Sequence, residues 1–287
     1  MQFISHPAFI CASGAPVSRL GQGTWHLAER GDRKSEIATL RRGLELGLNL
    51  VDTAEMYASG RSESLLGEAI HTFPREDIFV VSKVYPHNAG RNAIFAACDA
   101  TLSRLGTQYL DLYLLHWRGH IPLAETAACM EELVKNGKIR HWGVSNLDTD
   151  DMQQLAAVPG GTNCATDQVL YHVGCRGPEF DLFPWLKAHG MTAMAYCPLA
   201  QFGALDRSVI RSRTLAGIAD KHGASLAQVM LAFILRSENL IPIPKASTPA
   251  HVEDNARALA LTLEAEDLAQ IERDFPAPRR KVPLEIN

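Results

Sequence analysis

The sequence of 287 residues lacks a long apolar run, and no stretch approaches the roughly eighteen residues that a membrane-spanning helix needs. The N-terminal stretch MQFISHPAFICASGAPVSRL also lacks the basic flank and apolar block of a secretory leader. The 28 Lys and Arg against 32 Asp and Glu give a net charge of -4, and neither sign gathers into a long run. We therefore expect no membrane or nucleic-acid partner, no obligate protein partner and a cytoplasmic location.

The six cysteines lack the spacing of a metal site or a disulfide framework, because they form no C-x-x-C pair and have no histidine at ligand spacing. Scattered cysteines of this kind are typical of reduced thiols in the cytosol. The chain also lacks a Pro-, Gly- or Ser-rich linker. We expect no bound metal and a single domain over residues 1–287.

Short apolar runs are what the sequence does have. Eight of them recur along the chain, at 20–25, 49–54, 78–83, 110–116, 139–146, 164–170, 191–199 and 240–245. Between them lie segments with helical periodicity, including 35–47, 92–106, 123–137 and 225–237, several of which end at a glycine. Strand and helix are therefore expected to alternate.

Runs that are apolar on both faces predict a parallel sheet covered by helices, and eight such units close most economically into a (β/α)8 TIM barrel. A doubly wound sheet is the alternative, but no G-x-G-x-x-G follows an early strand; GQG at 21–23 precedes TW and no helix. Residues 2–18 are expected to form a short hairpin that closes the bottom of the barrel.

Polar residues end these apolar runs. Because chemistry in such barrels sits at the C-terminal ends of the strands, they are candidate site residues. A charged residue there costs free energy unless it is paired, and any single one could be a satisfied rim residue. Their convergence on one rim nevertheless indicates a site. The residues are Asp52, Lys83, His116, Ser145, Asn146, Asp167, Gln168, Tyr196 and Lys245.

The residue types suggest a proton donor beside a hydride acceptor. In our interpretation Asp52 fixes Lys83, and the charge of Lys83 lowers the pKa of Tyr57, which follows the second strand. Tyr57 would then protonate a carbonyl oxygen to which His116 donates a hydrogen bond. Since no side chain supplies hydride, a nicotinamide cofactor is implied.

Several motifs resemble the aldo-keto reductase family in their order along about residues 20–275. They are LVDTAEMY, SESLLG, VSKV, LLHW, WGVSN, YCPLA and IPKAS with EDN after it. DTAEMYA and SKVYPHNAG are most similar to bacterial members of the methylglyoxal-reductase kind. The resemblance implies a TIM barrel that reduces carbonyl compounds with a nicotinamide cofactor.

The resemblance also implies roles for individual residues. Asp52, Tyr57, Lys83 and His116 match the catalytic tetrad of the family. The residues matched to cofactor contacts are Gly23, Thr24, Asp52, Ser145, Asn146, Gln168, Tyr196, Pro198, Leu199, Lys245, Ser247, His251, Asp254 and Asn255. Trp25 and Trp117, unless they are only core or rim aromatics, are expected to line the substrate pocket with Tyr57 and His116.

Two departures from the family pattern stand out. Ala246 and His251 occupy positions where many NADPH-dependent relatives have a serine and an arginine facing the 2'-phosphate, while Lys245 keeps its point charge. We therefore expect NADPH to be preferred and NADH still to be used. Asp167 stands where relatives often have asparagine, and the sequence offers no reason for it.

Two other classes of function remain as alternatives. A cofactor-binding sensor or regulatory subunit on the same fold is disfavoured by the complete tetrad. A metal-dependent hydrolase would need paired histidines on the first strand, where LGQGTWH offers only His26. The chain continues for only about a dozen residues after the last expected helix, so we expect no long C-terminal lid and small substrates such as methylglyoxal and simple aldehydes.

Overall fold

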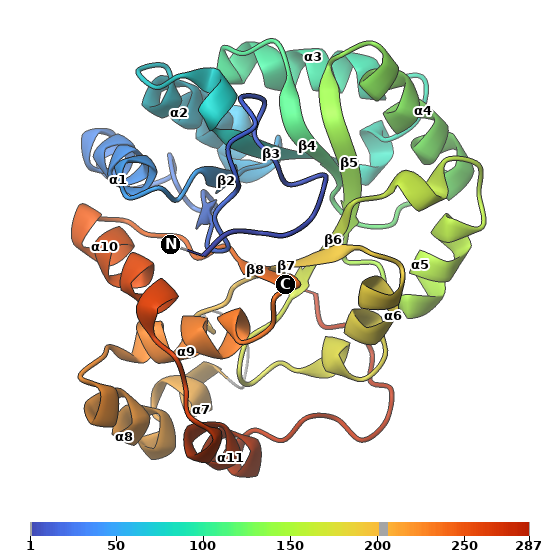
Figure 1. The fold of residues 1–287 in the computed structure, drawn as a ribbon. Helices are drawn as coiled ribbons and strands as arrows, with labels where there is room; N and C mark the ends of the chain where they lie inside the picture. Colours follow the sequence, from blue (N-terminus) through green and yellow to red (C-terminus); the bar gives the residue numbers. More distant parts are fainter. Residues whose placement is uncertain (1, 201–205, 287) are drawn as a thin grey trace.

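The computed structural model describes residues 2–200 and 206–286. Its strands form one eight-stranded parallel sheet in the order β1 to β8, which confirms the TIM barrel and all eight predicted strands (Figure 1). A parallel bridge between Gly23 and Lys245 closes the sheet between its first and last strands. The strands are β1 Gln22–Gly23, β2 Leu50–Asp52, β3 Phe79–Val84, β4 Leu110–Leu115, β5 Ile139–Ser145, β6 Thr166–Leu170, β7 Thr192–Tyr196 and β8 Leu240–Pro242.

Helices surround the barrel, as Figure 1 shows. They are α1 Arg33–Glu45, α2 Arg61–Ile70, α3 Ile94–Leu105, α4 Leu123–Lys135, α5 Thr149–Ala156, α6 Leu182–Ala188, α7 Asp206–Ile210, α8 Arg213–His222, α9 Leu226–Leu235, α10 Pro249–Arg257 and α11 Ala265–Asp274. Asp32 and Ser225 cap the N-termini of α1 and α9 with side-chain oxygens, and left-handed Gly106 and Gly223 follow α3 and α8. Of the helices described, none has the length and apolar character to cross a membrane.

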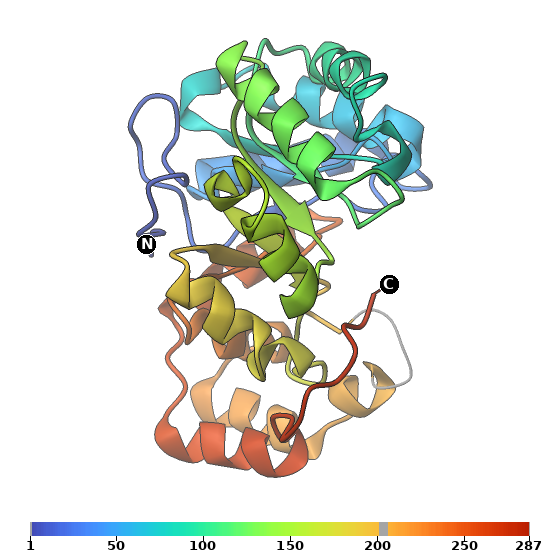
Figure 2. The same ribbon diagram turned by 90° about the vertical axis from the view of Figure 1, so that its right-hand side faces the viewer.

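The N-terminal segment, residues 2–18, covers the end of the barrel where the strands begin. Two isolated antiparallel bridges join its halves, Phe3 to Ser18 and Ile10 to Pro16. Phe9 is fully buried and stacks on Phe79 of β3 with ring centroids 5.2 Å apart. Figure 2 shows this segment and the C-terminal tail at opposite ends of the barrel. The predicted closure of the barrel bottom is confirmed.

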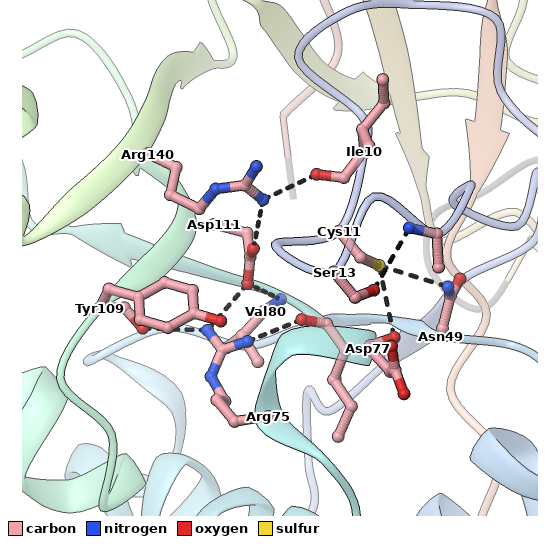
Figure 3. Close-up of polar contacts among 12 residues, drawn as sticks. Ile10, Cys11, Ser13, Asn49, Arg75, Asp77, Val80, Tyr109, Asp111 and Arg140 are labelled. Atoms are coloured by element: carbon pink, nitrogen blue, oxygen red, sulfur yellow. Dashed lines mark hydrogen bonds and ion pairs between the residues drawn. The ribbon is translucent and has the colours of Figure 1, made fainter.

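A buried carboxylate at this end of the barrel ties the segment to the strands (Figure 3). Asp111 of β4 is fully buried; its Oδ1 lies 2.9 Å from Arg140 Nη1, and its Oδ2 lies 2.8 Å from Arg75 Nη2. Its Oδ2 also accepts a hydrogen bond from the Val80 backbone N–H. Arg140 donates in addition to the Ile10 carbonyl. This network was not predicted from the sequence, because only polar residues that end the apolar runs were candidate site residues.

Candidate functional site

The barrel mouth at the C-terminal ends of the strands holds a cavity of about 270 Å³. Most of the predicted site residues line it, so the structure brings them together from strands far apart in the sequence. The predicted residues in its lining are Gly23, Trp25, Asp52, Tyr57, His116, Trp117, Ser145, Asn146, Gln168, Tyr196 and Lys245. Lys83 lies behind this wall with a fully buried side chain.

The ammonium group of Lys83 connects three acceptors. Lys83 Nζ donates to Asp52 Oδ1 at 2.6 Å, to the Thr53 carbonyl at 2.9 Å and to the Tyr57 hydroxyl at 3.0 Å. An ammonium has three protons, so these bonds satisfy it fully without water. The second oxygen of Asp52 accepts from Gln168 Nε2 at 2.8 Å. The Tyr57 hydroxyl is therefore held beside a buried, paired cation.

Tyr57 sits in a constrained turn between β2 and α2. The 3-10 segment η1, Tyr57–Gly60, follows β2, and its residues Ala58 and Ser59 both have left-handed backbone conformations with φ of 50° and 56°. The Tyr57 ring packs edge-on against His116, with centroids 5.8 Å apart. The Tyr57 ring thus contacts the imidazole of His116, and the Tyr57 hydroxyl accepts from Lys83.

The expected direction of the Tyr57 pKa is wrong for the protein without cofactor. Burial raises the pKa of Tyr57 well above its ordinary value, and the negative charge of Asp52 raises it further. The charge of Asp52, 2.6 Å from the ammonium of Lys83, offsets the charge of Lys83, so burial sets the direction. Burial, helped by the charge of Lys83, also lowers the pKa of His116 to about 2. Tyr57 is therefore a protonated donor and His116 a neutral imidazole near pH 7.

Another part of the cavity lining presents amide groups and an aromatic ring. Tyr196 OH donates to Asn146 Oδ1 at 2.8 Å, and Ser145 Oγ donates to the Gln168 carbonyl at 2.7 Å. Asn146 has a φ of 60°, and its Nδ2 donates to the His116 carbonyl, which orients the amide. An aromatic face beside amide and hydroxyl groups fits a nicotinamide ring with its carboxamide.

Of the residues predicted to contact the adenosine end of the cofactor, Lys245 lines the cavity and others do not. Lys245 lies at the edge of the cavity and donates to Ser247 Oγ at 3.0 Å, and the exposed His251 lies in the first turn of α10. Asp254 accepts from Ser225 Oγ and Gln228 Nε2, both at 2.6 Å, which ties α10 to α9. The cavity lining that the described residues form does not include Asp254.

Six other residues assigned to the cofactor also lie outside that lining, including Ser247 and His251. Thr24 and Asn255 are buried, and Pro198 and Leu199 follow β7. Leu199 packs partly buried against the hydrophobic core. Thr24, Asn255, Pro198 and Leu199 therefore lie close to the barrel mouth, but they do not line the cavity.

The cavity is also lined by residues that sequence reasoning did not assign to it, namely His26, Met56, Cys197, Ile243 and Ile286. His26, Met56 and Cys197 are each next to an assigned residue, and that adjacency was the only available signal. Ile286 reaches the mouth because the tail after α11 returns to the barrel (Figure 2). The short tail therefore contributes to the pocket despite the expected absence of a long lid.

Asp167 points away from this cavity. It pairs with Val144 in the register of β5 and β6, and its neighbour Gln168 faces the barrel interior, so Asp167 faces the helices. The residue is fully buried, and neither carboxylate oxygen has a hydrogen-bond partner among the residues described. Burial raises the pKa of Asp167 well above its ordinary value and so favours the neutral carboxyl group.

Comparisons with known proteins agree with this geometry. Residues 19–273 match the Aldo/keto reductase family. The chain is 52% identical over 268 residues to methylglyoxal reductase YeaE of Escherichia coli (strain K12), covering 93% of this chain and 94% of the relative.

Two solved structures of aldo-keto reductases from Klebsiella pneumoniae are also similar. One, in complex with NADPH, has a TM-score of 0.95 and 46% identity over 100% of both chains. The other, with NADP and acetate, has a TM-score of 0.93 and 48% identity over 96% of this chain and 98% of that one. The chain belongs to the aldo/keto reductase family, as its motifs predicted.

Proposed function

We propose that this protein reduces small aldehydes, ketones and dicarbonyls such as methylglyoxal to alcohols, with NADPH as hydride donor and Tyr57 as general acid. The observation that carries the proposal is the buried Lys83, which donates to both Asp52 and the Tyr57 hydroxyl at the cavity wall. The similarity to a methylglyoxal reductase and to NADPH-bound aldo-keto reductases supports the substrate class and the cofactor.

Tyr57 and His116 would act on the carbonyl oxygen of the substrate. NADPH, when bound, supplies the hydride to the carbonyl carbon. Tyr57 donates its proton to the oxygen as negative charge develops there, and the neutral His116 donates a hydrogen bond to the same oxygen. Lys83 stabilises the phenolate that remains, because it already donates to the Tyr57 oxygen. Asp52 keeps Lys83 charged and in place.

Other residues that line the cavity would hold the nicotinamide. Tyr196 would stack on the ring, and Ser145, Asn146 and Gln168 would bind its carboxamide, since all four line one cavity. Lys245 would contact the adenosine 2'-phosphate as a point charge without a guanidinium nearby in the motif. NADPH should therefore be preferred, and NADH should be used more weakly.

The proposal is tested by NADPH and NADH oxidation with a panel of simple aldehydes, ketones and dicarbonyls. We expect turnover with NADPH and methylglyoxal, and loss of that turnover in Tyr57→Phe. A protein that binds NADPH, seen by its change in fluorescence, but reduces no member of the panel would instead be the sensor or regulatory subunit.

A further inference from the structure

The turn that carries Tyr57 is held in a conformation that side chains disfavour. Ala58, Ser59 and Gly60 follow one another with left-handed φ angles of 50°, 56° and 84°. Non-glycine residues adopt this region at a cost in free energy, and such a turn persists only where surrounding groups hold it. The position of the Tyr57 hydroxyl therefore depends on whatever packs against the turn.

Arg104 of α3 packs against the turn at Gly60. A Cβ atom added to Gly60 would lie 2.6 Å from Arg104 Cδ and 2.7 Å from Arg104 Nε, so the arginine side chain occupies the space beside the glycine. Arg104 Nη2 also donates to Thr101 Oγ1 one turn earlier in α3. The guanidinium is thus fixed on its own helix while it supports the turn.

Glu63 of α2 joins Arg104 to the strand that carries Lys83. The side chain of Glu63 is fully buried, and its Oε2 accepts from Arg104 Nε at 2.5 Å. Its Oε1 accepts from Ser82 Oγ at 2.6 Å. Ser82 immediately precedes Lys83 in β3. A buried charge with both oxygens occupied is costly to disturb, so these bonds fix α2, α3 and β3 relative to one another.

We infer that Glu63 and Arg104 are positioning residues that hold the Tyr57 turn against Lys83 from behind the catalytic wall. Neither residue appears in the lining of the cavity, which keeps them apart from substrate and cofactor. The inference rests on the proposed role of Tyr57 as general acid.

Glu63 also acts on Lys83 through its charge. Burial lowers the pKa of Lys83, while the charges of Asp52 and, more weakly, Glu63 raise it. Asp52 and Tyr57 contact Lys83, Glu63 acts on it by its charge from the other face of β3, and the charge of Lys83 in turn lowers the pKa of His116. Removal of the Glu63 charge should therefore lower the pKa of Lys83, so that Lys83 loses its proton at a lower pH.

The inference is tested with two variants of the whole chain, Glu63→Gln and Arg104→Met. For each variant, kcat and KM for methylglyoxal, the dissociation constant of NADPH and Tm are measured. We expect kcat to fall by about 10- to 100-fold in each variant, as misplacement of a catalytic group does, while the NADPH dissociation constant changes less than about twofold. In Glu63→Gln, the alkaline decline of kcat should also move to lower pH. Glu68→Gln and Arg33→Met are the matched controls, because this exposed ion pair also involves α2 and should leave kcat unchanged.

A double variant separates positioning from general stability. In a Tyr57→Phe background, Glu63→Gln should cause little further loss of kcat, because the group that it positions is already gone. Should Glu63→Gln fail to fold, Ser82→Ala removes a single bond of Glu63 and should lower kcat in the same direction. Variants with a lower Tm but wild-type kcat and pH profile would overturn the inference. Full activity in Tyr57→Phe would instead overturn the proposed function.

Discussion

Gln168 Nε2 donates a hydrogen bond to Asp52 Oδ2 over 2.8 Å, although the two residues are 116 positions apart in the sequence. The bond links the wall proposed to hold the nicotinamide with the wall proposed to donate the proton. Since the other oxygen of Asp52 accepts from Lys83, one buried carboxylate aligns both halves of the site.

Tyr57→Phe should lower kcat by roughly 10² to 10⁴, because it removes the proton donor and keeps the ring. The dissociation constant of NADPH should stay nearly unchanged, because Ser145, Asn146 and Tyr196 are intact. Steady-state kinetics and a fluorescence titration measure the two quantities. A variant with a third of the wild-type turnover would remove Tyr57 from the mechanism.

Lys83→Met should also reduce kcat strongly, because Asp52 would lose its buried counter-ion and the developing phenolate its stabilising charge. The control is Lys135→Met, because it is the same substitution at an exposed lysine, the last residue of α4. Turnover should distinguish the two variants by at least about two orders of magnitude. Equal tolerance at both positions would contradict the proposed tetrad.

Lys245→Ala should weaken NADPH binding far more than NADH binding, because only NADPH has the 2'-phosphate that this ammonium would contact. His251→Arg should strengthen NADPH binding by about 1 kcal/mol or more if a bidentate phosphate contact forms. The ratio of the two dissociation constants, measured in wild type and both variants, checks this. If Lys245→Ala left the ratio of the NADPH and NADH dissociation constants unchanged, the 2'-phosphate would not lie at Lys245.

Asp167→Asn should stabilise the protein at neutral and alkaline pH. Because burial raises the pKa of Asp167 in the folded state, the folded protein binds a proton that the unfolded chain releases above about pH 3.9. Wild-type stability therefore falls as pH rises from there, and the asparagine variant avoids this loss. Tm measured from pH 4 to pH 8 should show a difference between the proteins that grows with pH; a constant difference would mean that Asp167 is not neutral when folded.

Asp111→Asn should destabilise the fold by about 3–5 kcal/mol, because Arg75 and Arg140 would lose the carboxylate that pairs them. Denaturant unfolding gives this value. The activity of the remaining folded protein should be unchanged, since Asp111 lies at the end of the barrel away from the cavity. A loss of kcat without a loss of stability would contradict this assignment.

The sequence by itself determined the barrel, because hydrophobic periodicity and helix-ending glycines are local signals. It also determined which polar side chains meet, since the C-terminal ends of parallel strands share one rim whatever the details of packing. For this reason Asp52, Lys83, His116 and Gln168 could be placed at one site from their positions alone.

Only the tertiary structure decided what depends on distance and burial. The pKa of Tyr57 rises where local reasoning expected it to fall, because burial and the negative charge of Asp52 both oppose ionisation of the phenol. Ile286 enters the cavity through a chain return that no residue pattern indicates. Glu63 and Arg104 meet from different helices, and the contact of Arg104 with the Tyr57 turn exists only after α2 and α3 have packed. Local patterns specify elements and faces, whereas electrostatics and contacts between distant segments depend on the packed arrangement of the whole barrel.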